Sequence, residues 1–218
     1  MRIFKEVMKG KSLTRILQNL ALSEVEIYGQ AIDLGSKSKN ASYYRFLKIK
    51  KDTNLVFTDL FPTTDGVMKI DLESRFPVES GTQDFLLLNN VLEHLFGYEN
   101  CILECHRILK KGGSLIGVVP FLHRVHYDPD DFFRYTESSL KRLFEKAGFS
   151  EIKIKPLGFG PFSAAADQFA EVVKLRLAAA VIYSLAISMD KILNRLFKGN
   201  NAVKAENFPL DYFFVCKK

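Results

Sequence analysis

Cysteine and tryptophan are scarce in this sequence, which has three cysteines and no tryptophan among 218 residues. An odd cysteine count without framework spacing excludes a disulfide scaffold of the secreted type. Cys101 and Cys105 lie four residues apart on an expected helix, next to His106. One helix turn cannot supply a closed tetrahedral metal site, and no second ligand cluster follows. We therefore expect buried apolar thiols, and we predict no metal site.

The chain also lacks long runs of one charge. Lysine and arginine total 31 against 25 acids, a net charge of +6. No arginine-rich or aromatic-interleaved stretch is present, so the sequence does not predict a nucleic-acid binder. Met1–Gly10 has no apolar core behind its charges, and we expect a cytoplasmic protein without a signal sequence. The basic N-terminal residues predict a solvated face rather than a lipid contact: Arg2, Lys5, Lys9, Lys11 and Arg15.

Four short apolar runs each carry a polar residue near their end, at 30–35, 54–59, 67–71 and 84–89, and the first has an acid and then a glycine there. Parallel strands whose carboxyl ends offer polar groups suit an open sheet that binds a ligand across that edge. A glycine there allows backbone approach, and an acid after the second strand suits a ribose diol. The pattern predicts a site for a nucleoside-containing cofactor.

Along the rest of the chain, segments with the apolar spacing of a helix alternate with short apolar runs typical of strands. We expect helices at 13–28, 43–49, 99–109 and 136–148, and further strands at 114–119, 150–157 and 212–218. This order predicts one α/β domain, residues 1–218, with a doubly wound, mostly parallel, seven-stranded Rossmann-like sheet. Residues 1–29 form a helical lead-in, and 158–209 a helical insertion before the last strand.

The centre of this insertion, Leu177–Met189, is largely apolar and has basic flanks. Its thirteen residues are fewer than the roughly 20 that span a bilayer. One interpretation is a helix lying in the membrane plane, which would make the protein peripheral at the membrane. The preferred one is a helix packed over the sheet or against a second subunit in a homodimer.

Six motifs in order make residues 31–157 resemble the class I S-adenosylmethionine-dependent methyltransferases. The group with a Leu-Glu-His turn is the most similar. The motifs are Ala31-Ile-Asp-Leu-Gly35, Phe57-Thr-Asp59, Ile70-Asp-Leu72, Asn89-Asn-Val-Leu-Glu-His-Leu95, Arg107-Ile-Leu-Lys-Lys-Gly-Gly113 and Lys146-Ala-Gly-Phe149. The resemblance implies S-adenosylmethionine as the cofactor and a last strand antiparallel to its neighbour.

The resemblance also implies roles for several strand-end residues. Asp33 and Gly35 would flank the methionine part of the cofactor, and Asp59 would accept from both ribose hydroxyls. Asp71, with Leu72, would meet the adenine, although Asp71 could instead be a loop acid or a helix cap.

Two further positions come from the fourth motif. Asn89, slightly preferred over Asn90, would lie beside the amino-acid portion of the cofactor. His94 would lie near the methyl group, or would be a satisfied structural donor.

The first loop departs from the family pattern, because Lys37 and Lys39 replace its second and third glycines. These lysines weaken the motif, or they neutralise the cofactor carboxylate or a substrate phosphate. Tyr43-Tyr-Arg45 resembles a variant in the family, so we retain the cofactor prediction.

Catalysis is expected in the loop 120–136, which is dense in histidine, acids and arginine. His126 is the predicted general base because its ordinary pKa is near neutrality, and His123 is the alternative. Asp131 or Asp130 could orient the histidine, and Arg134 could bind an anionic group of the substrate. The competing interpretation is an ion-pair lattice that only shapes the loop.

The predicted function is methyl transfer to a small molecule or to a sugar or lipid-linked hydroxyl. The loop resembles that of methyltransferases of bacterial surface polysaccharide synthesis. One alternative is a non-catalytic subunit with lost or altered cofactor binding, which Lys37 and Lys39 favour. A dinucleotide oxidoreductase is less consistent with the sequence, since the Gly-x-Gly-x-x-Gly turn is absent.

Overall fold

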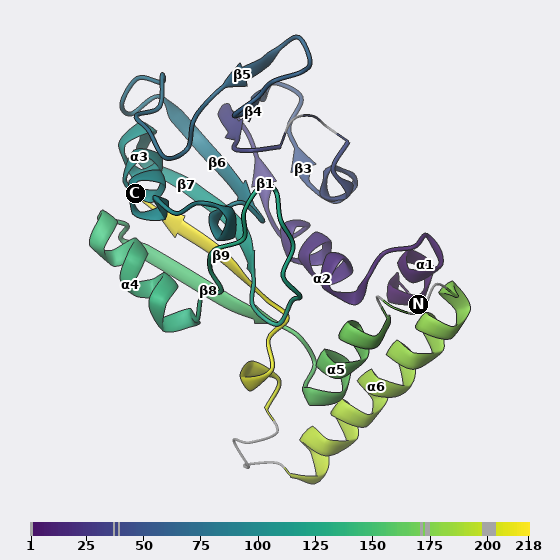
Figure 1. Ribbon diagram of the computed structural model, residues 1–218. Coiled ribbons are helices and arrows are strands. Elements are labelled where there is room, and N and C mark those ends of the chain that lie inside the picture. The colour runs from purple at the N-terminus through teal and green to yellow at the C-terminus, as the bar shows by residue number, and fades with distance from the viewer. Residues whose placement is uncertain (1, 37, 39, 171, 173–174, 198–203) are drawn as a thin grey trace.

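The computed structural model describes residues 2–36, 38, 40–170, 172, 175–197 and 204–218. Its main feature is one seven-stranded sheet (Figure 1). Across the sheet the strands are β5 (Val67–Lys69), β4 (Asn54–Asp59), β2 (Gln30–Asp33), β6 (Gln83–Asn89), β7 (Leu109–Pro120), β9 (Asp211–Lys217) and β8 (Glu151–Leu157). β9 runs antiparallel to both neighbours, and the other pairs are parallel, as predicted.

Helices cover both faces of the sheet, which is why its central strands are apolar on both sides. α3 (Tyr98–Ile108) and α4 (Glu137–Ala147) pack on one face, around Leu86, Leu88 and Phe144. α2 (Leu13–Leu22) packs on the other, with Leu87 and Ile116 in that core. This doubly wound arrangement confirms the predicted fold class.

The expected caps of α4 are present at both ends. The Thr136 hydroxyl accepts from the Ser139 backbone N–H at 3.2 Å, and Gly148 closes the helix at φ 96°. The hydroxyl accepts from a first-turn N–H that has no partner within the helix, and glycine tolerates the left-handed backbone at the helix end.

Two predicted helices were wrong in part, both before β4. The helix expected over 13–28 ends at Leu22, where Ser23 is the C-cap residue and its hydroxyl donates to the Leu20 carbonyl. The helix expected over 43–49 is only the 3-10 turn η1 (Ser42–Arg45). Two short strands, β1 (Glu26–Ile27) and β3 (Lys48–Ile49), pair there in parallel.

The insertion between β8 and β9 contains α5 (Pro161–Ala170), α6 (Arg176–Leu196) and the 3-10 turn η4 (Ala205–Asn207). α6 packs against α5 and the N-terminal α1 (Arg2–Met8) rather than over the sheet (Figure 1). Buried Asp167 ties α5 to α2 and α6, accepting from the Leu13 backbone N–H at 3.0 Å and the Tyr183 hydroxyl at 2.8 Å.

α6 is longer than its apolar centre suggested. At 21 residues it is long and apolar enough to cross a membrane, by length and composition only. The expectation that it is too short is therefore corrected. A third of its most apolar window is buried inside the protein. A row at helical spacing is largely exposed: Leu177, Val181, Leu185, Met189, Ile192 and Leu196.

Candidate functional site

A cavity of about 280 Å³ lies at the carboxyl edge of β2, β4, β5 and β6. Gly35, Asp59, Leu72 and His94 line it, together with residues 128–130 of the loop after β7. Four segments far apart in the sequence therefore meet where the strand-end pattern predicts a site. Its volume is near the lower limit of small-molecule pockets, about 300 Å³.

Gly35 lets the backbone turn closely beside this cavity. Its φ of 75° suits glycine, and a Cβ there would come within 3.0 Å of Val91 Cγ2. The Gly35 N–H donates to the Thr58 hydroxyl at 3.1 Å, which fixes the turn to β4. A larger residue at position 35 would strain the turn and crowd Val91.

The two acids predicted to bind the nucleoside differ in their surroundings. Asp59 lies at the end of β4, is 8% exposed and accepts from the Phe61 backbone N–H at 2.8 Å. Asp71 is exposed, and it accepts from the Glu73 N–H at 2.9 Å and the Ser74 hydroxyl at 2.7 Å. The loop-cap alternative for Asp71 therefore describes its contacts, and both Asp71 and buried Leu72 line the cavity.

Asp33 does not line the cavity in this structure. Its carboxylate is buried and accepts from the Tyr43 hydroxyl at 2.5 Å and from the Tyr44 hydroxyl. Burial raises the pKa of Asp33 to about 6, and the hydroxyls of Tyr43, Tyr44 and Ser36 oppose that rise. The sequence predicted the two tyrosines only as part of a loop variant, and their contact with Asp33 was not predicted.

The raised pKa of Asp33 predicts a pH-dependent stability. The folded protein binds a proton at Asp33 more readily than the unfolded chain does, so this residue stabilises the fold as the pH falls below about 6. Between pH 7.5 and 5 the free energy of unfolding of the natural protein should rise relative to Asp33→Asn by roughly 1 kcal/mol. Urea unfolding at both pH values measures the difference. A constant difference would contradict the assignment of the titration to Asp33.

The two asparagines at the end of β6 point to different places. Asn90, at φ 53°, lines the cavity, and its side chain pairs with Gln18 of α2 at 3.1 and 3.2 Å. The Asn89 amide is buried and has no hydrogen-bond partner within the described part of the chain. Asn89 is not among the residues that line the cavity, so its predicted place beside the cofactor stays a prediction.

Lys37 and Lys39, which replace the family glycines, lie outside the described residues. Their proposed effect on the cofactor stays a prediction.

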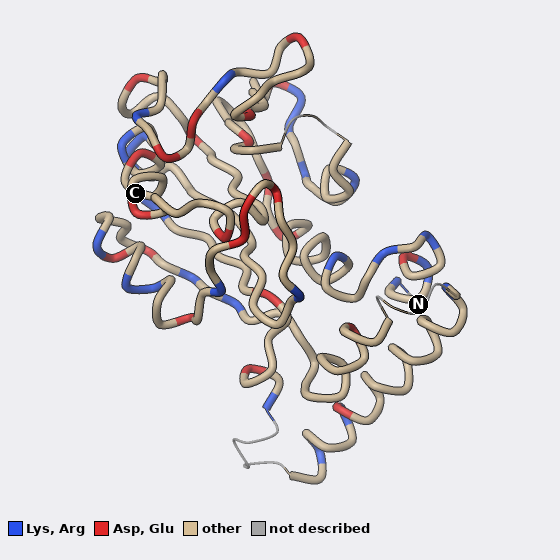
Figure 2. The backbone as a smooth tube through the Cα atoms, in the orientation of Figure 1, with Lys and Arg blue, Asp and Glu red and all other residues tan. Residues whose placement is uncertain are grey.

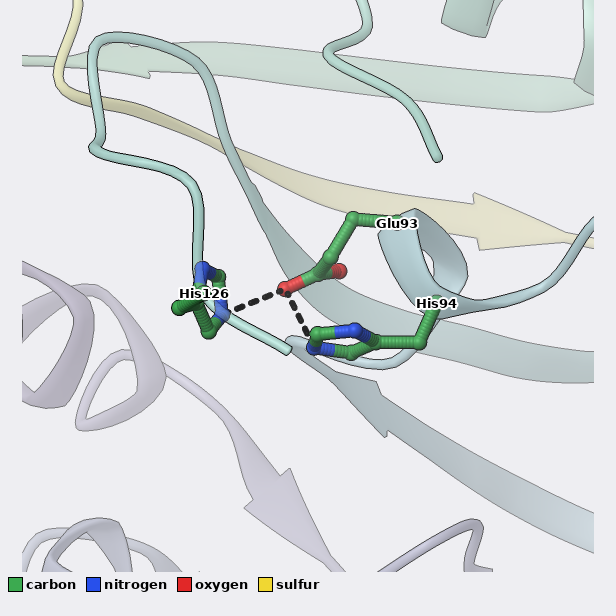
Figure 3. A group of neighbouring side chains, drawn as sticks. All are labelled: Glu93, His94 and His126. Atoms are coloured by element: carbon green, nitrogen blue, oxygen red, sulfur yellow. Dashed lines mark ion pairs between the residues drawn. The ribbon is translucent and has the colours of Figure 1, made fainter. Parts of the chain in front are cut away.

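Three side chains meet at the wall of the cavity near His94 (Figure 3). The Glu93 carboxylate is fully buried, and its Oε1 is 3.7 Å from His94 Nε2 and 3.9 Å from His126 Nε2. Burial raises the pKa of Glu93 to about 8. The 3-10 turn η2 (Leu92–His94) supplies Glu93 and His94, and the loop after β7 supplies His126.

A bidentate ion pair shapes the loop around His126. Arg134 donates to both carboxylate oxygens of Asp131, at 2.5 and 2.7 Å, and to the Arg124 carbonyl at 3.1 Å. Asp131 also accepts from the His126 backbone N–H at 2.8 Å. These bonds hold the pKa of Asp131 well below its usual range, Arg134 being the main cause, while burial lowers the pKa of His126.

These contacts support the lattice interpretation for Arg134 and the orienting role for Asp131. Arg134 is committed to groups of its own loop rather than presented to a substrate. His123 lies beside His126, their ring centroids 5.0 Å apart, so both predicted base residues are in one cluster. Asp130 contributes its backbone carbonyl, which accepts from His94 Nδ1.

Glu93 was the main residue that the sequence analysis missed. The available signal was a carboxylate between Leu92 and His94 in an otherwise apolar turn, and we treated it only as part of a motif. Its burial could not be read from the sequence, because it depends on Phe132 and Phe133, whose N–H groups donate to the Glu93 carbonyl.

Comparisons with known proteins agree with this geometry. Residues 47–117 match the family model of the methyltransferase domain. No curated protein matches the sequence. Several solved structures share the fold at low sequence identity, and they show the fold alone.

Three of these structures show the range of activities, sequence identities and coverage. A phosphoethanolamine N-methyltransferase of Haemonchus contortus, in complex with phosphomonomethylethanolamine and S-adenosylhomocysteine, is 13% identical with a TM-score of 0.53. That likeness covers 92% of this chain and 52% of the other, so this chain spans about half the length of that relative. A methyltransferase of Thermotoga maritima is 18% identical over 99% of this chain and 96% of its own, with a TM-score of 0.55. The [4+2]-cyclase SpnF is 14% identical over 94% and 81%, with a TM-score of 0.57.

The residues at the cavity fit the cofactor that the fold implies. Gly35 provides a close backbone approach, buried Asp59 a carboxylate at the end of β4, and Leu72 an apolar wall. The predicted resemblance is confirmed as a resemblance: a methyltransferase-domain model matches residues 47–117, and solved structures with this fold include S-adenosylmethionine-dependent methyltransferases. Residues 47–117 thus resemble the methyltransferase domain in sequence, and the chain has the fold of S-adenosylmethionine-dependent methyltransferases of known structure.

Proposed function

We propose that this chain transfers a methyl group from S-adenosylmethionine to a hydroxyl oxygen. The observation that carries the proposal is that the strand-end cavity opens onto the histidine cluster, with His94 belonging to both. A cofactor in the cavity would supply an electrophilic methyl group, and the cluster lies where an acceptor would need to lose a proton.

Residues of the cavity would bind the cofactor, and residues of the loop after β7 would accept the proton. Asp59 would accept hydrogen bonds from the ribose hydroxyls, and Leu72 would pack on the adenine. Gly35, which has no side chain, would allow the cofactor to lie close to the backbone. In the transfer the acceptor oxygen gains the methyl group and loses its proton, and the sulfonium becomes a thioether. His126 or His123 would take that proton, and Asp131 holds the loop that carries His126.

A calorimetric titration with S-adenosylmethionine and S-adenosylhomocysteine tests the cofactor step. Micromolar binding of both at one site per chain is the expected result, because these enzymes release the second as product. A folded protein that binds neither at millimolar concentration would contradict the proposal and favour the non-catalytic alternative.

The acceptor class is proposed from a second cavity. It has a volume of about 790 Å³ and lies between α1, α5, α6 and the loop after β7. Lys11, Arg124 and Arg176 line it together with apolar residues such as Val7 and Ala179. A mixed basic and apolar lining suits an amphipathic anionic acceptor, such as a sugar carried on a lipid phosphate.

The exposed face of α6 supports delivery of that acceptor from a membrane surface. Figure 2 shows few charged positions along α6, and Leu177 and Leu185 are each 61% exposed on it. A stripe of apolar side chains with basic residues nearby is typical of helices that lie in a membrane interface. A homodimer contact on the same stripe is the alternative.

Co-sedimentation with phosphatidylglycerol vesicles separates these two interpretations. We expect the natural protein to bind and Leu185→Glu to bind at least tenfold less. The matched control is Leu103→Glu, because Leu103 is 52% exposed on α3, away from the stripe. Concentration-dependent dimers that Leu185→Glu abolishes, without vesicle binding, would instead support the homodimer.

A further inference from the structure

Glu93, His94 and His126 form a set of three ligand atoms, which all lie within 4.8 Å of one another. Figure 3 shows both imidazole rings directed toward the same carboxylate. A tetrahedral zinc ion holds its ligand atoms roughly 3.3 Å apart, with metal–nitrogen distances near 2.0 Å. The 3.7 and 3.9 Å from Glu93 Oε1 to the two Nε2 atoms are a few tenths of an ångström longer, within reach of side-chain rotation.

The hydrogen bonds of the rings decide which nitrogen faces the carboxylate with a lone pair. His94 Nδ1 lies against the Asp130 carbonyl, an acceptor, so that nitrogen carries the proton. His126 Nδ1 is 3.4 Å from the Arg124 carbonyl and 3.5 Å from Asp131 Oδ2, which are also acceptors. Both Nε2 atoms therefore present lone pairs toward Glu93. Metal-binding histidines typically have their other ring nitrogen held in this way.

Three acceptors thus converge with no donor between them. Neither Glu93 carboxylate oxygen has a hydrogen-bond partner within the described part of the chain, and the side chain is fully buried. A buried, unpaired carboxylate is costly unless a cation or a proton compensates it. A proton on Glu93 is the simplest alternative occupant.

We propose that Glu93, His94 and His126 bind one divalent transition-metal ion, of the class of zinc or manganese, beside the cofactor cavity. Two imidazoles and one carboxylate are a ligand set that such ions favour, whereas magnesium and calcium prefer oxygen ligands. Three protein ligands leave at least one position open, as in catalytic rather than structural sites. The site adjoins the cavity, because His94 lines it.

Metal binding itself does not depend on the proposed methyl transfer, whereas a role of the metal ion in catalysis rests on that proposed function. An acceptor hydroxyl on the open position would be held close to the cavity and made more acidic. The hydroxyl proton would then pass to His123, since His126 serves as a ligand. The methyl group would move from sulfur to that oxygen, so that one carbon–sulfur bond breaks as one carbon–oxygen bond forms.

Calorimetric titration of the full chain with zinc chloride and manganese chloride, after removal of metals with a chelator, tests the site. We expect one site per chain, micromolar or tighter for zinc, and at least tenfold weaker for magnesium chloride. His126→Ala and Glu93→Gln should each lower the zinc affinity at least tenfold. His106→Ala should keep it, because His106 lies on α3 and does not belong to the set.

Two results would overturn the proposal. One is no zinc binding by the natural protein at millimolar concentration, which would leave the proton as the occupant. The other is equal zinc binding by the natural protein and both ligand variants. His126→Ala keeps the test decisive if Glu93→Gln does not fold, because the His126 side chain is 29% exposed on a loop. S-adenosylmethionine titrated into the metal-free protein reports separately on the proposed function, so that either proposal can fail alone.

Discussion

Replacing Asp59 with alanine should weaken S-adenosylmethionine binding at least about 100-fold. Asp59 is the buried carboxylate at the end of β4, and it faces the cavity beside Gly35 and Leu72. A carboxylate that accepts from both ribose hydroxyls would make two charge-assisted hydrogen bonds, each contributing about 1.5–3 kcal/mol. The smaller value for each already gives about 3 kcal/mol, which corresponds to a factor of about 100.

Calorimetry on the natural protein, Asp59→Ala and Asp59→Asn measures this loss. Asp59→Asn should fall between the others, because its amide oxygen can still accept from one hydroxyl or from the Phe61 N–H. Circular dichroism confirms that each variant is folded. Equal affinities for the natural protein and Asp59→Ala would show that the ribose lies elsewhere.

Asp71→Ala is the informative comparison, because Asp71 is already engaged. Its two oxygens accept from the Glu73 N–H and the Ser74 hydroxyl. We expect this variant to lose less than tenfold in cofactor affinity, and to lose it through the shape of the turn before Leu72. A larger loss for Asp71→Ala than for Asp59→Ala would reverse the roles we propose for the two acids.

The sheet could be predicted from the sequence because burial on both faces leaves a plain signal. β4 has the predicted bounds, Asn54–Asp59, and β6 differs by one residue, since each is an apolar run that ends in a polar group. The caps of α4 were equally readable, because Thr136 and Gly148 act on backbone groups only a few residues away. Local chemistry of this kind needs no knowledge of the tertiary structure.

The features that the sequence did not predict depend on contacts between separate segments of the chain. Tyr43 and Tyr44 look like part of a helix in sequence, yet their hydroxyls donate to Asp33, and a 3-10 turn with a short strand replaces the helix. Glu93 becomes significant only because η2 and the loop after β7 meet around it. Both depend on contacts between segments that periodicity treats separately, so tertiary packing overrides the local preference.

The second large effect concerns Gly117, in the middle of β7. A Cβ built on Gly117 would lie 2.0 Å from the Leu88 carbonyl oxygen and 2.5 Å from the Phe214 ring. Rotation of a side chain could move Phe214, but the Leu88 carbonyl belongs to the backbone of the neighbouring strand. Gly117→Ala should therefore force β6 and β7 apart, and lower the free energy of unfolding by about 4 kcal/mol.

Urea unfolding of Gly117→Ala, beside Gly97→Ala as the control, measures this cost. Gly97 has an ordinary φ of −83°, and a Cβ there would meet its nearest neighbour, Glu73, at 3.4 Å. The control should stay within about 1 kcal/mol of the natural protein, because that contact is ordinary. Equal free energies of unfolding for the two variants would contradict the close packing of β6 against β7 at Gly117. Asn90 lines the cavity directly after β6, the strand that this substitution would displace, so cofactor affinity should fall together with stability in Gly117→Ala.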